Sequence, residues 1–188
     1  MKIELSTELL DIVSPDTYWN NLWVDVNEDY EDEVKQMMMR ICGDYIREAL
    51  EETDFADAKV TMKAFKSPSQ YNYGTDWCLF DLEFDDNMID IIKDKAKNSQ
   101  DFISWSRKEY KSYDGFISFA PLGEEYFKAL DGPLDTLHYK KEYAISMWIM
   151  YQLRNYPNKQ EEYEMDVREQ MSMNGWDVDD EETDYCES

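Results

Sequence analysis

Apolar residues recur with two different periods along this chain of 188 residues, and each period predicts a different element. Between Tyr30 and Glu52 they fall at i, i+3, i+4 and i+7, which predicts an amphipathic helix. Across residues 58–64 and again across 77–85 every second residue is apolar. That alternation is typical of strands with one buried face, so we predict a strand in each segment.

The remaining patterns complete a mixed fold. Short apolar runs predict strands at residues 22–26 and 116–119, and one helical turn is expected at residues 7–10 within an otherwise irregular lead-in. Helices are expected from Met88 and after Ser99, whose hydroxyl can cap the second. The order is β, α, β, β, α, β. It predicts an α+β fold, an antiparallel sheet with helices on one face in the ferredoxin-like or split βαβ order.

The pattern becomes entirely helical after the break at residues 131–133. One helix contains Trp148 and ends before Pro157, and a second covers Gln160 to Met173. We therefore predict an α+β domain at residues 1–130, a C-terminal helical extension at 131–174, and an acidic, flexible tail at 175–188.

Charge changes the picture more than any motif does. The chain has 43 Asp and Glu against 19 Lys and Arg, a formal charge of −24, whereas small domains usually carry a net charge of magnitude roughly 2–8. The excess is concentrated, because residues 25–54 hold eleven acids against three bases and residues 161–188 hold twelve against one. Such a surface repels nucleic acid and attracts a basic protein, so we expect a basic protein partner and no direct binding of DNA or RNA.

The spacing of the acids makes this expectation more specific. Carboxylates at alternate strand positions stand about 6.6 Å apart, and those on one helix face about 5–6 Å apart, while phosphates of one DNA strand advance about 3.4 Å along the axis. These rows can imitate a nucleic-acid strand, and Tyr163, Trp176 and Tyr185 are expected to stack on arginine planes beside them. The predicted partner-binding residues are Asp81, Glu83, Asp85, Glu161, Glu162, Asp166, Glu169, Asp177, Asp179, Asp180, Glu181 and Glu182.

Candidate chemistry is sparse. His138 is the only histidine, and the three cysteines lack the spacing of a zinc site, so we expect no catalytic residue, no metal and no cofactor. Pro15-Asp16 followed by Glu33-Val34-Lys35 has the composition of the PD-(D/E)xK nuclease motif, which leaves a metal-dependent nuclease as a remote alternative. In that family, however, the ExK element lies on a strand, whereas here it falls in a helical pattern.

Two segments rich in turn residues and aromatics carry a resemblance to a known group of proteins. Ser67–Asp76 and Ser112–Phe119 resemble motifs of small acidic proteins of phages and mobile elements from gut bacteria. Many of those are anti-restriction or anti-CRISPR proteins, and several act as DNA mimics. The resemblance implies an inhibitor that binds a host defence nuclease or its guide-RNA complex and blocks its access to DNA.

The remaining expectations concern location and the main alternative. No apolar run approaches the roughly 20 residues of a membrane span, and no secretory signal is recognisable. An odd number of cysteines without a framework suits a reducing compartment, so we expect the cytoplasm of the bacterial host. The alternative from another functional class is an acidic adaptor or assembly protein that binds a basic host or virion protein.

Overall fold

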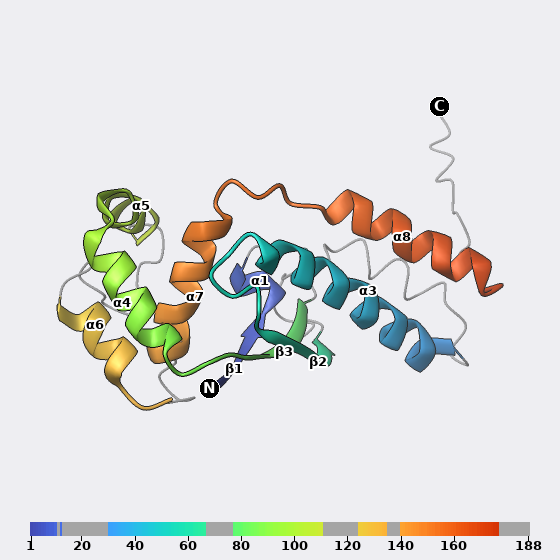
Figure 1. Cartoon of the computed structure of the whole chain (residues 1–188). Coiled ribbons are helices and arrows are strands. Elements are labelled where there is room, and N and C mark those ends of the chain that lie inside the picture. Colours follow the sequence, from blue (N-terminus) through green and yellow to red (C-terminus); the bar gives the residue numbers. More distant parts are fainter. Residues whose placement is uncertain (11, 13–29, 67–76, 111–123, 135–139, 177–188) are drawn as a thin grey trace, which may run out of the picture.

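The computed structural model describes residues 1–10, 12, 30–66, 77–110, 124–134 and 140–176. These residues form strands and helices that belong to the predicted α+β class (Figure 1). The elements in chain order are β1 (Lys2–Ser6), α1 (Thr7–Leu10), α3 (Glu31–Glu51), β2 (Lys59–Lys66), β3 (Trp77–Glu83), α4 (Met88–Asn98), α5 (Gln100–Tyr110), α6 (Glu124–Asp131), α7 (Lys140–Leu153) and α8 (Gln160–Met173).

Within the described residues, the sheet has three antiparallel strands in the order β1-β3-β2. Ile3 lies opposite Leu82 and Leu5 opposite Phe80, so the apolar residues of neighbouring strands share one face. All four of these side chains are buried. The period of two in the sequence therefore identified the core side of β3 correctly.

The structure corrects one part of the predicted strand order. β2 and β3 confirm the predicted strands, and α1 confirms the predicted helical turn. However, the first strand is β1, which lies in the segment that we expected to be an irregular lead-in. The predicted strands at residues 22–26 and 116–119 lie outside the described residues, so the complete ferredoxin-like order stays a prediction.

Helix α3 separates the sheet from α8, and both helices match their predicted ranges closely (Figure 1). α3 approaches β2 at Gly43, where an added Cβ would lie only 3.0 Å from Cγ of Met62. α8 runs antiparallel to α3. Lys159 pairs with Glu48 at one end of the two helices, and the rings of Tyr30 and Trp176 meet at the other.

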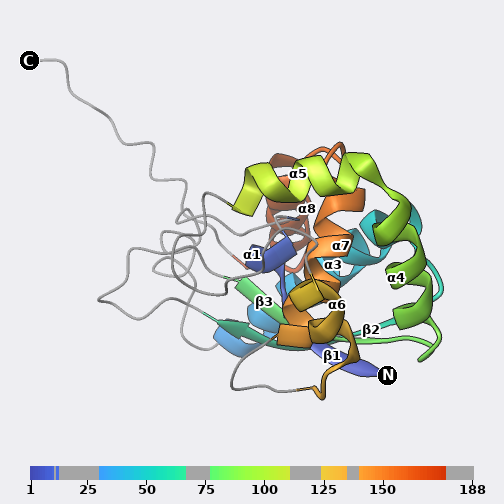
Figure 2. The same cartoon turned by 90° about the vertical axis from the view of Figure 1, so that its left-hand side faces the viewer.

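Helices α4 to α7 pack together beside the sheet, with α5 lying across α4 and α7 (Figures 1 and 2), and we call this group the four-helix bundle. Figure 2 shows α4, α5 and α6 arranged around α7, which also packs against β1 and α1. Phe102 of α5 lies at the centre, with its ring centroid 4.8 Å from that of Trp148 and in contact with three further aromatic rings. Ser99 caps α5 as predicted, because its Oγ accepts a 3.1 Å hydrogen bond from the backbone N–H of Phe102.

The helices of the predicted extension pack on the predicted N-terminal domain. α7 contacts β1, and α8 contacts α3. Their buried residues join the core formed by the sheet, since Ile149 and Val167 belong to the same apolar cluster as Phe80. The division into a domain, an extension and a tail stays a prediction, because residues 177–188 lie outside the described part of the chain.

Candidate functional site

The acids predicted on β3 do not form an open row. The side chain of Asp81 is only 12% exposed and lies between two lysines, with Lys2 Nζ 3.0 Å and Lys63 Nζ 3.4 Å from its carboxylate oxygens. Glu83 is exposed at the end of the strand, and Asp85 is exposed in the turn before α4. The sequence indicated the polar face of β3 correctly, but on that face lysines from both neighbouring strands neutralise Asp81.

A bulge in β2 explains why this face is neutralised. The register shifts between Met62 and Ala64, so Lys63 is an extra residue without a partner on β3. Its side chain reaches across the central strand to Glu4 on β1, at 2.5 Å, and this hydrogen bond raises the pKa of Lys63. The three strands together carry three acids and four bases, so their charges nearly balance.

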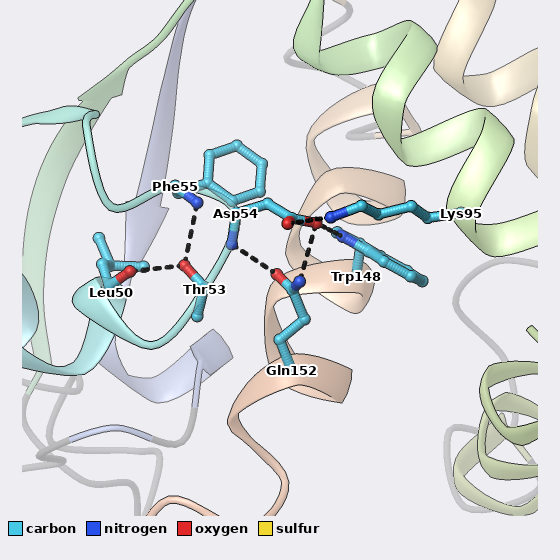
Figure 3. A network of polar contacts seen from close by, with 7 residues as sticks. All are labelled: Leu50, Thr53, Asp54, Phe55, Lys95, Trp148 and Gln152. Carbon is cyan, nitrogen blue, oxygen red and sulfur yellow. Dashed lines mark hydrogen bonds and ion pairs between the residues drawn. The ribbon is translucent and has the colours of Figure 1, made fainter.

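Asp54, in the acid-rich segment 25–54, is an internal link rather than part of a surface. Its carboxylate accepts hydrogen bonds from Trp148 Nε1 at 3.0 Å and from Gln152 Nε2 at 2.8 Å, and it forms an ion pair with Lys95 (Figure 3). Burial alone would raise the pKa of Asp54, but these three partners outweigh burial and lower it. The carboxylate thus joins the end of α3 to the bundle.

The acids of α8 differ from these two cases. Glu161, Glu162, Asp166 and Glu169 are all exposed, and within the described part of the chain no ion pair joins any of them to a base. Glu162, Asp166 and Glu169 follow one another at i, i+4 and i+7, so they share one helix face. The other predicted residues, Asp177, Asp179, Asp180, Glu181 and Glu182, lie outside the described residues.

Tyr45 lies where α3 packs on α8, and the negative charges of both helices affect its pKa. Its hydroxyl donates a 2.6 Å hydrogen bond to Asp166. Burial is the largest cause that raises the pKa of Tyr45, followed by this bond and by the negative charges of Asp166, Glu162 and Glu48. Carboxylates from both helices therefore act on the same point.

Counting by element shows how unevenly the charge is distributed. α3 and α8 together, which we call the acidic layer, contain eleven acids and four bases, a net charge of −7. The four-helix bundle contains eight acids and eight bases, a net charge of zero. The described excess is thus concentrated on one helix pair.

The aromatic residues beside the acids are less available than expected. Tyr163 is fully buried, and its hydroxyl donates a 3.0 Å hydrogen bond to the backbone carbonyl of Met38, so it anchors α8 to α3 and cannot stack on an arginine of a partner. Trp176 is partly buried, with its ring centroid 6.1 Å from that of Tyr30. Sequence reasoning instead missed Met165 and Met173, two strongly exposed residues of α8. Their positions off the stripe of Tyr163, Val167 and Met171 would have indicated this.

Among the described residues, no three His, Cys, Asp or Glu side chains are grouped to hold a metal ion. Glu33 and Lys35 lie on α3, in the helical setting that their pattern indicated, while Asp16 and His138 lie outside the described residues. No helix in the described part of the chain is long and apolar enough to cross a membrane.

Comparison of the chain with protein-family models, with curated proteins and with solved structures found no match.

Proposed function

We propose that this protein is a non-enzymatic inhibitor that acts in the bacterial cytoplasm and occupies the basic DNA-binding channel of a defence nuclease. The target class is a Cas9-type effector or a restriction enzyme. The observation that carries the proposal is the outer face of α8, where exposed carboxylates form no ion pair with a base among the described residues, although the charge of Glu162 acts on Lys159. Elsewhere, Asp81 and Asp54 are compensated by lysines.

The geometry of α8 supports a role as a decoy for DNA. Glu162, Asp166 and Glu169 succeed one another about 5–6 Å apart along one helix face, a spacing that Lys and Arg rows of a DNA channel can meet. Their attraction acts over about 8 Å at physiological ionic strength. Association is therefore fast and sensitive to salt, as is typical of electrostatically steered complexes.

Charge reversal at exposed positions tests whether this face is the one that binds. Glu161, Glu162 and Glu169 are replaced together by Lys, which leaves the Tyr45–Asp166 hydrogen bond intact. The matched control replaces three exposed acids of the bundle, Asp90, Asp94 and Glu124, with the same change in net charge. In cleavage assays with a panel of Cas9-type and restriction nucleases, we expect the α8 variant to lose at least about tenfold in inhibition and the control less than about threefold. Equal losses would contradict a localised surface.

Competition distinguishes the proposal from its rivals. Duplex DNA should displace this protein from its target, since both occupy one channel. A partner that binds the protein and DNA at the same time would instead support the acidic adaptor or assembly protein. Cleavage of a labelled duplex by the purified protein with Mg²⁺ would support the nuclease alternative and overturn the proposal.

A further inference from the structure

The outer face of α8 also carries exposed apolar side chains. Met165 and Met173 are 69% and 72% exposed, which makes them the most exposed large apolar residues in the described part of the chain. The inner face of the same helix is already occupied by Tyr163, Val167 and Met171, which are fully buried. The two exposed methionines therefore have no packing role on α3.

Acids and methionines alternate along this face. Glu162, Met165, Glu169 and Met173 follow at intervals of three, four and four residues, which places them in one line along the helix. We call this line the α8 ridge. With a rise of 1.5 Å per residue, the two methionines stand about 12 Å apart and the two glutamates about 10.5 Å apart.

Those distances match the repeat of a second helix. Residues at i and i+7, or i and i+8, of a partner helix are likewise about 10.5 and 12 Å apart and lie on one face. Two apolar residues of such a helix can contact Met165 and Met173, while basic residues beside them meet Glu162 and Glu169. Methionine suits this role because its unbranched thioether adapts to differently shaped apolar partners.

Electrostatics selects the kind of helix. α8 has five acids and one base, and the chain as a whole carries −24, so a second copy of this protein is repelled and a Lys- or Arg-rich helix is attracted. A pure imitation of phosphates needs carboxylates alone. Apolar side chains at 69% and 72% exposure add affinity only where a partner removes them from water.

We infer that the α8 ridge binds a basic amphipathic helix of the partner protein, with Met165 and Met173 contacting its apolar stripe and Glu162 and Glu169 its basic flanks. The inference rests on the proposed function. It specifies that the surface of the target bound by the ridge is a cationic helix with an apolar stripe, and not a channel that is recognised by its charge alone.

Two fluorescent helical peptides of equal length and charge test this. One has Leu at i, i+3 and i+7 among lysines, and the other has Ala in place of each Leu, which preserves helix propensity. Fluorescence anisotropy gives the Kd of each peptide for the full chain. The variants are Met165→Gln with Met173→Gln, and a matched control, Ile91→Gln with Leu134→Gln, which alters two exposed apolar residues outside α8.

We expect the wild type to bind the Lys/Leu peptide at least about tenfold more tightly than the Lys/Ala peptide, a difference of about 1.4 kcal/mol. The Met165→Gln/Met173→Gln protein should lose that preference, Met165→Leu/Met173→Leu should retain it, and the control pair should leave it unchanged. Equal affinity of the wild type for both peptides, or an unchanged preference in the glutamine variant, would overturn the inference.

The two proposals fail separately. If both peptides bind equally and duplex DNA still displaces the protein from a nuclease, only the amphipathic helix is wrong. If the Lys/Leu preference depends on the methionines while no nuclease is inhibited, the ridge binds a helix in a different kind of partner, and the proposed function is the part that fails.

Discussion

The acidic layer and the four-helix bundle differ in their balance of acids and bases: the layer carries a net charge of −7, and the bundle carries none. In the bundle, three acids form ion pairs: Asp101 with Arg154 at 2.8 Å, Asp131 with Lys93, and Glu124 with Lys128, while Lys95 extends from the bundle to Asp54. On the outer face of α8 the acids face solvent without such partners among the described residues. The acids of the described residues are therefore not distributed evenly over the molecule.

The unpaired acids on the outer face of α8 lower its stability, and the packing of its inner face on α3 raises it. Like charges at i and i+4, such as Glu162 and Asp166, destabilise a helix by about 0.2–0.5 kcal/mol per pair. Glu161 and Glu162 recover part of that, since acids in the first turn interact favourably with the helix dipole. The rest of the compensation comes from the buried side of α8, where Tyr163, Val167 and Met171 pack on α3.

Removing the anchor of α8 should have the largest effect. We expect Tyr163→Ala to lower the free energy of unfolding by about 3–5 kcal/mol, the usual cost of truncating a buried aromatic residue. Urea denaturation measures that loss. Amide exchange should accelerate in α8 more than in α7, because the acidic layer depends on this contact and the bundle does not. Equal acceleration in both helices would show that the two regions are one cooperative unit.

Asp54 lies where the two regions meet, and we expect its replacement to cause the second-largest loss of stability. Asp54→Ala leaves Lys95, Trp148 Nε1 and Gln152 without their shared acceptor, so we expect a loss of about 2–3 kcal/mol in urea denaturation. Asp57→Ala, at an exposed position three residues away, is the control and should change stability by less than about 0.5 kcal/mol. Similar effects of both variants would contradict the linking role.

The same carboxylate gives a pH dependence with a definite sign. The pKa of Asp54 is lowered in the folded state, because its hydrogen-bond partners outweigh burial. Its stabilisation is therefore complete above the unfolded pKa of about 3.9 and is lost as pH falls through the folded pKa. The difference in stability between wild type and Asp54→Asn should be constant near neutral pH and should shrink below about pH 4. A constant difference down to pH 2 would argue against the lowered pKa.

Local pattern predicted the elements well, and α8 shows why. The helix predicted after Pro157, from Gln160 to Met173, has these same ends in the structure. β1 was missed although residues 2–6 alternate with period two, because five residues before a predicted helical turn gave too short a pattern to weigh against an irregular start.

The site was less predictable, because the spacing of acids in the sequence does not show which bases from distant segments lie beside them in the fold. Period two correctly placed Asp81 on the polar face of β3, but only the sheet register brings Lys63 and Lys2 onto it. Asp54 is similar, since its partners lie 41 to 98 residues further along the chain. Charge counts therefore located the acidic segments but could not separate paired from unpaired acids.

Salt should distinguish an unbalanced layer from a balanced bundle. Screening shortens the range of repulsion from about 30 Å at 0.01 M ionic strength to about 3 Å at 1 M. We expect the wild type to gain about 0.5–1 kcal/mol of stability over that range. A parallel titration with a neutral osmolyte measures, for subtraction, the change in stability that does not come from charge screening. Glu162→Gln with Glu169→Gln should gain less, and Asp90→Gln with Asp94→Gln in the bundle should behave as the wild type does. Identical salt dependence of all three proteins would mean that the repulsion is not localised on α8.

Glu142 offers the smallest test, because it is an acid in the balanced region that is buried against another acid. Burial, with a lesser contribution from the negative charge of Glu4, raises the pKa of Glu142, so its charged form is disfavoured in the folded state. Its place in the first turn of α7 offsets part of this cost through the helix dipole. We expect Glu142→Gln to be more stable than the wild type by up to about 0.5 kcal/mol at pH 7. That gap should close as pH falls through the folded pKa and below the unfolded value of about 4.3, because Glu142 is then protonated in both states. A glutamine variant that is less stable at pH 7 would mean that the charged carboxylate of Glu142 is stabilised in the folded state despite its burial.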